Sequence, residues 1–397
     1  GLACLLHEKP FAGINGSGKH NNWSLTTDDG INLMNPGETP HENIQFLLVL
    51  ACVMKAVDVH ADLLRQSTAI PGNDQRLGAA EAPPAIISIF LGEQLEDVID
   101  QLCSTGEAAR SKQGGILKTG VATLADFTKD ATDRNRTSPF AFTGNKFEFR
   151  MVGSSDSVSS PNVVLNTIVA EAFKEAADEL EQSDDFDCAV HDLIKRLMAE
   201  HRRIIFSGNG YSEEWVEEAK RRGLPNLKAG IDSVEALRSE KAMRLFESFG
   251  VYTRTELESL AEIEYEAYAK TVNIEARTML DMASKQIVPA VIKYTTRLAS
   301  SVKTVREACP EADVSVQTEL LLETSDLLSE MKVALAALEE KTASAAATPG
   351  NKERAYAYLQ EVMPAMQALR APADRLEMLV DKELWPFPSY GDLVFEV

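Results

Sequence analysis

The stretch KFEFRMVGSSDSVSSPNVVLNTIVA, residues 146–170, contains the change of pattern that decides the fold. Its first five residues alternate charged and aromatic side chains, which is the period of a β-strand. From Asn162 onward, apolar residues recur instead at the spacing of a long helix. The sequence therefore predicts an α+β part up to about Ser160 and a predominantly helical part after it.

Helices are expected on both sides of this change. Before it, the chain is rich in Gly, Pro and Asn, with helix-period stretches at 42–65 and 92–110. After it, Pro289 should kink or break the longest helical stretch. The predicted helical ranges after the change are 162–182, 186–204, 212–222, 232–249, 254–300, 315–342 and 351–383. The apolar final segment, 383–397, is expected to dock on the rest of the protein.

The composition is that of a globular protein that repels polyanions. The 397 residues include 40 basic and 61 acidic side chains, which gives a formal charge of −21, and 44% of the residues are hydrophobic. We therefore expect neither nucleic acid nor a membrane surface as a partner. The five cysteines lack CxxC spacing, and the sequence has no apolar run of about 18 residues. These features predict a reduced, cytoplasmic protein.

Two loop segments carry residue types that bind anions and metal ions. The first, NGSGKHNNWS at 15–24, places His20 after two glycines that let a backbone approach a ligand closely. Taken alone, it is also typical of a plain turn before a strand. The second, GNDQRLGAAEAPPA at 72–85, holds Arg76 and Glu81, a guanidinium suited to carboxylates beside a possible base. A surface Arg–Glu pair is the alternative interpretation.

A third segment, 133–155, contains the strand quoted above. Alternation places Lys146, Glu148 and Arg150 on one face and the two phenylalanines between them on the other. A carboxylate between cations suits a site that holds a metal ion and anionic substrates together. A solvated outer strand is the alternative interpretation of the same pattern.

In this order, the three segments resemble the catalytic domain of glutamine synthetases. The run KPFAGINGSGKHNNWS at 9–24 is similar to the family segment K-P-x-F-x-x-N-G-S-G-x-H-x-x-x-S, and Arg76 before Glu81-Ala82-Pro83 resembles its R…E-A-P loop. NRTS at 135–138 resembles N-R-S-A, and EFR at 148–150 resembles E-V-R. Three features are typical of the type III class. They are the exact residues of the first two segments, the long insert before Arg136 and the terminus WPFPSYGDLVFEV. The resemblance covers the whole chain.

The resemblance implies a fold and a division into domains. We expect an α+β glutamine synthetase catalytic-domain fragment, an antiparallel sheet with flanking helices, followed by a long-helix C-terminal region. The C-terminal part of the catalytic domain is predicted at 1–160, its helical continuation at 161–252 and the type III helical bundle at 253–397. The β-grasp domain and further metal-binding glutamates of the family lie upstream of the K-P-x-F segment. We therefore expect this chain to be incomplete at its start and inactive alone.

The resemblance also implies a reaction and a site. The reaction is the ATP-dependent ligation of ammonia to L-glutamate through a γ-glutamyl phosphate, with Mg²⁺ or Mn²⁺, in a ring-shaped homo-oligomer that is a dodecamer by resemblance. The implied roles are His20 and Glu148 for the metal, Asn15, Gly16, Arg76 and Arg150 for glutamate, Ser24, Arg136 and Lys146 for ATP, and Glu81 with Arg136 for catalysis. Arg136 would hold the transferring phosphoryl group, and Glu81 would close over the intermediate.

Two positions depart from the family pattern. The second arginine of N-R-S-A-x-x-R falls on Ala141, and the second histidine after the metal-binding one falls on Asn22. We predict Lys146 as the compensating cation. Two other functions stay open at this point, namely a non-catalytic assembly or ligand-binding subunit, and a γ-glutamyl ligase that uses another amine, such as a polyamine.

Overall fold

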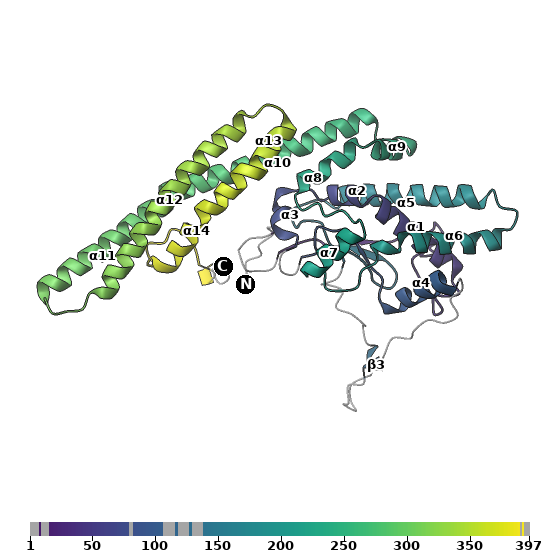
Figure 1. The fold of residues 1–397 in the computed structure, drawn as a ribbon, viewed down its shortest axis with the longest axis horizontal. Helices are drawn as coiled ribbons and strands as arrows, with labels where there is room; N and C mark the ends of the chain where they lie inside the picture. Colours follow the sequence, from purple (N-terminus) through teal and green to yellow (C-terminus); the bar gives the residue numbers. More distant parts are fainter. Residues whose placement is uncertain are drawn as a thin grey trace. The chain divides into compact units, whose positions relative to one another are not determined.

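The protein folds into two compact units in the computed structural model (Figure 1). The sheet unit ends at Ala261, and the helical unit begins at Glu262, inside one long helix. The predicted domain boundaries at 160 and 252 stay predictions. The residues that the structure describes are 8, 16–78, 82–105, 116–117, 127–128, 138–389 and 391–392.

A small four-stranded sheet organises the sheet unit. Its strands are, in order across the sheet, β1 (Asn21–Trp23), β6 (Phe147–Phe149), β5 (Phe140–Phe142) and β2 (Ile89–Phe90). β6 pairs antiparallel with both β1 and β5, whereas β2 pairs parallel with β5. The prediction of an antiparallel sheet is therefore wrong at β2. The chain leaves β2 and returns to β5 through a long crossover, which is the kind of connection that a parallel pair requires.

The aromatic face of β6 forms the centre of the core. Phe147 stacks on Phe140 with ring centroids 4.5 Å apart, and Phe149 meets Phe140 edge-on at 6.1 Å. All three side chains are fully buried. The predicted alternation along residues 146–150 is confirmed. The alternative of a solvated outer strand is wrong, because β6 is hydrogen-bonded on both sides.

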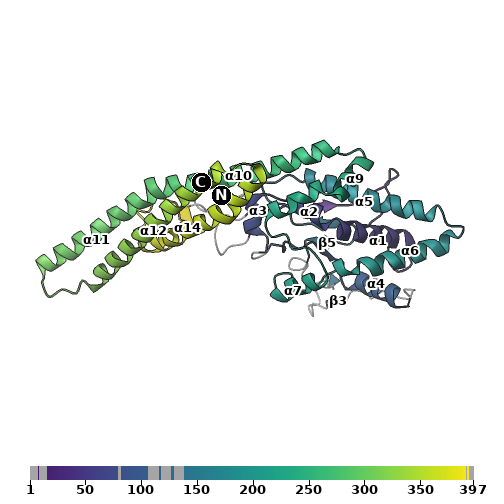
Figure 2. The ribbon, with the colours of Figure 1, turned by 45° about the horizontal axis from the view of Figure 1, so that its top comes forward.

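Helices cover this sheet, and α1, α5 and α6 lie side by side (Figure 2). The helices of the sheet unit are α1 (Ile44–Val59), α2 (Ala61–Gln66), α3 (Pro71–Arg76), α4 (Glu93–Thr105), α5 (Ser159–Leu180), α6 (Phe186–His201), α7 (Glu213–Arg221), α8 (Gly230–Ser233) and α9 (Glu240–Ser248). Several begin at a side chain that accepts from the amide three residues on, as at Asn43, Asp185, Ser212 and Ser239. The pattern predicted one helix over 42–65, but the structure breaks it at His60.

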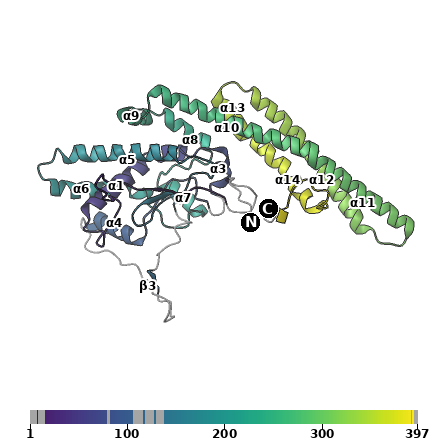
Figure 3. The ribbon, with the colours of Figure 1, turned by 180° about the vertical axis from the view of Figure 1, so that it is seen from behind.

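The helical unit contains long helices with two irregular turns. Its elements are α10 (Arg254–Met282), a π-helical turn (Ala283–Ile287), α11 (Val288–Ala308), α12 (Ser315–Ala347), α13 (Asn351–Ala357), a second π-helical turn (Tyr358–Val362) and α14 (Met363–Leu379). α11, α12 and α14 lie side by side (Figure 3). None of the helices in the described ranges could span a membrane.

Each π-helical turn precedes a proline near the start of the next helix. Pro289 follows the first turn and Pro364 follows the second. Proline lacks the N–H that an α-helix would use, and its ring collides with the carbonyl four residues back, so an inserted residue relieves both problems. The predicted interruption at Pro289 is confirmed. The matching one at Pro364 was not predicted, although the same residue type marks it.

Candidate functional site

His20 and Glu148 meet on the sheet face opposite the aromatic core. Asn22 of β1 pairs in register with Glu148 of β6, so His20, two residues before Asn22, faces the same side. His20 Nδ1 lies 2.8 Å from Glu148 Oε1, and the two side chains are 55% and 14% exposed. An imidazole and a carboxylate in contact are ligands of the right type for a divalent cation. In the described ranges, no cluster of three or more His, Cys, Asp or Glu residues could hold such an ion.

The two departures from the family pattern lie directly beside Glu148. Asn22 is its partner on β1, and Ala141 is its partner on β5. A row across three strands therefore presents an amide, a carboxylate and a methyl group. Nearby, the exposed Ser24 Oγ donates to Asn32 Oδ1 at 3.0 Å. Lys146, the predicted compensating cation, is half-buried at the start of β6.

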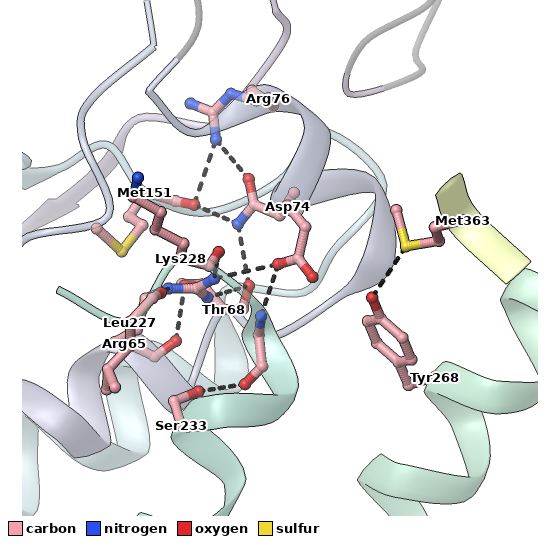
Figure 4. A network of polar contacts seen from close by, with 12 residues as sticks. Arg65, Thr68, Asp74, Arg76, Met151, Leu227, Lys228, Ser233, Tyr268 and Met363 are labelled. Carbon is pink, nitrogen blue, oxygen red and sulfur yellow. Dashed lines mark hydrogen bonds and ion pairs between the residues drawn. The ribbon is translucent and has the colours of Figure 1, made fainter. Parts of the chain in front are cut away.

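Arg76 ends the short helix α3 and is buried, with 3% of its surface exposed. Its Nη1 donates to Asn73 Oδ1 at 2.9 Å and to the Met151 carbonyl at 3.2 Å (Figure 4). Its Nη2 donates to the Arg150 carbonyl at 2.8 Å. The Nε–H has no hydrogen-bond partner among the described residues. The alternative of a surface Arg–Glu pair is wrong for Arg76, because this guanidinium lies inside the protein.

Burial changes the acidity of this guanidinium. It lowers the pKa of Arg76 to about 10, while the carboxylate of Glu8 opposes the change. Arg76 therefore stays charged at neutral pH. A charged group with an unused donor, held inside the protein, is suited to bind an anion that reaches it.

The glycines of the NGSG segment allow the loop to lie against Arg76. A Cβ atom on Gly16 would be 2.6 Å from Arg76 Cγ, and one on Gly18 would be 2.1 Å from Arg76 Nη2. Neither contact is possible for a larger residue without displacing the arginine. The amide of Lys19 also donates to the Val152 carbonyl at 2.9 Å. The two glycines therefore leave room for the Arg76 side chain, which the sequence pattern alone did not predict.

Sequence analysis missed Glu8, which is 3% exposed beside these groups. Its Oε1 accepts from the amide of Ser155 at 2.7 Å and from the Ser155 hydroxyl at 2.5 Å. A Cβ on Gly72 or on Gly153 would lie 2.9 Å from its carboxylate oxygens. Glu8 stands in LACLLHEKPF, where no local pattern signals its burial, because glutamate is mostly found on protein surfaces.

Arg150 directly follows β6 and is 4% exposed, and its Nη2 donates to the Ser138 carbonyl. The Arg150 side chain therefore points into the protein, while Arg76 binds the backbone carbonyls of residues 150 and 151. Three of the predicted site residues, Asn15, Glu81 and Arg136, lie outside the described residues. The roles implied for Asn15, Glu81 and Arg136 thus stay predictions.

Comparison with known proteins links this arrangement to one family. Residues 189–306 match the family model described as glutamine synthetase C-terminal domain. The type-3 glutamine synthetase of Dictyostelium discoideum is 43% identical over 408 residues, which cover 100% of this chain and 55% of that protein. The glutamine synthetase of Bacteroides fragilis is 40% identical over 404 residues, covering 99% of this chain and 55% of that protein.

A third relative, the glutamine synthetase of Butyrivibrio fibrisolvens, is 41% identical over 404 residues, which cover 100% of this chain and 56% of that protein. The chain thus spans little more than half the length of the relatives it matches. The similarity runs through both the sheet unit and the helical unit. Over its whole length, therefore, this chain is similar to one protein named type-3 glutamine synthetase and to two others named glutamine synthetase.

Proposed function

We propose that this chain is part of an ATP-dependent ligase that forms L-glutamine from L-glutamate and ammonia through a γ-glutamyl phosphate. The observation that carries the proposal is the 43% identity, across the whole chain, to a protein named type-3 glutamine synthetase. The His20–Glu148 pair supports it, since the two residues that the family pattern selects for a metal ion are 2.8 Å apart. The assembly would be a homo-oligomeric ring, a dodecamer, in the cytoplasm.

The proposed metal ion is Mg²⁺ or Mn²⁺, held by His20 and Glu148 together with other ligands. A divalent cation there would neutralise phosphate oxygens of ATP during transfer. Glu148 also fixes the imidazole of His20 through their mutual hydrogen bond. Because Glu148 is only 14% exposed and His20 is 55% exposed, the carboxylate anchors the pair and the imidazole faces the solvent side.

The proposed substrate contacts follow the same face and the loops around it. The buried charge of Arg76, with its unused Nε–H, would attract a carboxylate of glutamate. The remaining proposed roles are glutamate contacts by Asn15, Gly16 and Arg150, ATP contacts by Ser24 and Lys146, phosphoryl binding by Arg136 and closure over the intermediate by Glu81. An acyl phosphate needs water excluded so that ammonia attacks it first.

The test uses the longest polypeptide in which this chain occurs. Its ATP-dependent γ-glutamyl transfer to ammonia and to hydroxylamine is measured with Mg²⁺ and with Mn²⁺. Glu148→Gln keeps the shape of the side chain but removes its charge, and we expect activity to fall by about 100-fold or more, with a higher metal concentration for half-maximal rate.

A matched control is Glu175→Gln, since Glu175 is 52% exposed and pairs with Lys55 on the helices. This variant should keep full activity. Unchanged activity and metal dependence in Glu148→Gln would contradict the metal role. Transfer to a polyamine but not to ammonia would replace the proposed substrate, and ATP binding without transfer would favour a non-catalytic subunit.

A further inference from the structure

The helix that carries Arg76, α3, is too short to be stable without contacts to the rest of the protein. It has 6 residues, Pro71–Arg76. Its orientation must come from contacts with the rest of the sheet unit. Two neighbouring side chains, Asn73 and Asp74, provide such contacts in different directions.

Asn73 connects α3 to the segment beneath Arg76. Its Nδ2 donates to the Thr68 carbonyl at 2.9 Å and to the Met151 carbonyl at 2.8 Å, while its Oδ1 accepts from Arg76 Nη1. Asn73 is completely buried. The amide therefore joins Arg76, the segment that follows β6 and the turn before α3.

Asp74 makes the second connection, to a buried arginine. Arg65 Nη2 lies 3.1 Å from Asp74 Oδ1, and the two side chains are 1% and 7% exposed (Figure 4). Arg65 also donates through Nε to the Leu227 carbonyl at 2.8 Å and through Nη2 to the Lys228 carbonyl at 3.0 Å. A buried pair with these additional hydrogen bonds is costly to break, because either partner alone would be a buried charge.

Gly230 completes this arrangement from far along the chain. Its amide donates to Asp74 Oδ1 at 2.7 Å, and its carbonyl accepts from the Ser233 hydroxyl at 2.5 Å. A Cβ on Gly230 would lie only 3.0 Å from Ala69 Cα, so the absence of a side chain allows the approach. The segment 227–233 is thereby fixed against the turn that leads into α3.

We propose that Arg65 and Asp74 are positioning residues for Arg76, and that the segment 227–233 sets the glutamate-binding geometry through them. The inference rests on the proposed function, in which Arg76 binds a carboxylate of glutamate. It adds a route by which residues within the 189–306 family match act on a binding group more than a hundred residues earlier. The affinity for a bound carboxylate depends steeply on the placement of the guanidinium that holds it.

The experiment compares Asp74→Asn and Gly230→Ala with the unaltered protein. Asp74→Asn keeps an oxygen for the Gly230 amide but removes the negative charge that Asp74 places beside Arg65, whereas Gly230→Ala keeps both charges and forces the amide away. We expect the KM for glutamate to rise on the order of tenfold in both, since both displace α3, with the KM for ATP unchanged. The backbone amides within residues 71–78, to which Pro71 contributes none, should exchange with deuterium faster, and this exchange can be measured without catalytic activity.

The matched control is Asp58→Asn. Asp58 is a buried carboxylate on α1 that accepts from His201 Nδ1 at 2.8 Å and from Arg203 Nε at 3.0 Å, and its side chain is 2% exposed. It should lower stability without changing the KM for glutamate or the exchange of residues 71–78. Because Asp58 tests the general effect of losing a buried charge, it separates positioning from loss of stability.

Hydrogen exchange tests whether Asp74 and Gly230 anchor α3, and the KM values test whether this anchor affects glutamate binding. Unchanged exchange at residues 71–78 in both variants would overturn the anchor, even in a protein without activity. Faster exchange with an unchanged KM for glutamate would overturn the link to binding. An equal rise of both KM values in all three variants, Asp58→Asn included, would reduce the effect to general destabilisation and also overturn the proposal. If the unaltered protein transfers no glutamyl group, the proposed function fails, and the exchange data still decide whether Asp74 anchors α3.

Discussion

The two units of this protein differ in the burial of some of their charged pairs, although both also carry exposed pairs one helical turn apart. In the sheet unit, Arg65 and Asp74 form a pair that is buried on both sides, and buried Asp58 and His60 contact the more exposed Arg203 and Glu171, which lie far away in sequence. In the helical unit, the described ion pairs join exposed groups, several of them one helical turn apart, as in Glu266 with Lys270. Buried pairs specify geometry because their partners cannot separate without stranding a charge, whereas exposed pairs are screened by water.

Apolar packing differs between the units in the same sense. In the sheet unit, interlocking aromatic rings surround β6. In the helical unit, α12 contributes one stripe, in which Leu327, Met331, Leu335 and Leu338 are buried. Val333 on its other side is 73% exposed. In the sheet unit, packing therefore holds particular side chains in one position, whereas the helical unit is stabilised mainly by burying an apolar stripe along each helix.

The largest effect should follow from removing an aromatic ring beneath the candidate site. Phe147 is fully buried, and its ring centroid lies 4.5 Å from that of Phe140. Phe147→Ala should cost about 3–5 kcal/mol of unfolding free energy. It should also expose β6 amides to exchange, since Glu148 follows directly. The measurement is urea unfolding together with hydrogen exchange resolved along the chain.

The control for this prediction is Leu338→Ala on α12, which is also fully buried. It should cost about 2–5 kcal/mol but leave exchange in β6 unchanged, because it enlarges a cavity in the helical unit only. Equal changes of exchange in both units after either substitution would contradict the separation of their cores.

A smaller effect concerns acid stability and the pair of His60 with Glu171. The hydrogen bond from His60 holds the pKa of Glu171 below its ordinary value of 4.5, and the charges of Lys55 and Lys241 act in the same direction. Because this pKa is lower in the folded protein than in the unfolded chain, the pair contributes stability above pH 4.5 that is lost as the pH falls through the folded pKa. Glu171→Gln should therefore flatten the loss of unfolding free energy as the pH falls below 4.5.

The exposed Glu266 provides the comparison in the helical unit, since its side chain is 45% exposed. Glu266→Gln should leave the acid limb of the stability curve as it is in the unaltered protein. Unfolding by urea at several pH values measures both variants. A steeper loss of unfolding free energy at acid pH in Glu171→Gln would show that folding raises, and does not lower, the pKa of Glu171.

The sequence predicted those features of the fold that depend on local periodicity and on single residue types. The alternation of charged and aromatic residues identified β6 and its buried face, and Pro289 identified the irregular turn between α10 and α11. The family pattern selected His20 and Glu148, which the structure brings together. In each instance the information lies within a few residues or within a motif.

The rest depended on contacts between distant segments, which no periodicity contains. The parallel pairing of β2 with β5 follows from a crossover, and the burial of Glu8 follows from glycines at positions 72 and 153 that leave space for it. Nothing in the segment GNDQR predicts that Asp74 contacts the Gly230 amide and the Arg65 guanidinium. Polar side chains are the hardest to place from sequence, because the same residue is common on surfaces and rare inside.

The smallest effect should follow from removing one exposed cation of the helical unit. Lys270 Nζ lies 2.8 Å from Glu266 Oε1 one turn earlier on α10, and the lysine side chain is 67% exposed. Lys270→Ala should change the unfolding free energy by less than about 0.5 kcal/mol, because an exposed pair one turn apart contributes only a few tenths and alanine favours the helix. Urea unfolding at low salt and at high salt should give the same small difference, or a smaller one at high salt. A loss above about 1 kcal/mol would mean that this exposed pair fixes geometry as the buried pairs do, and the contrast between the two units would then not hold.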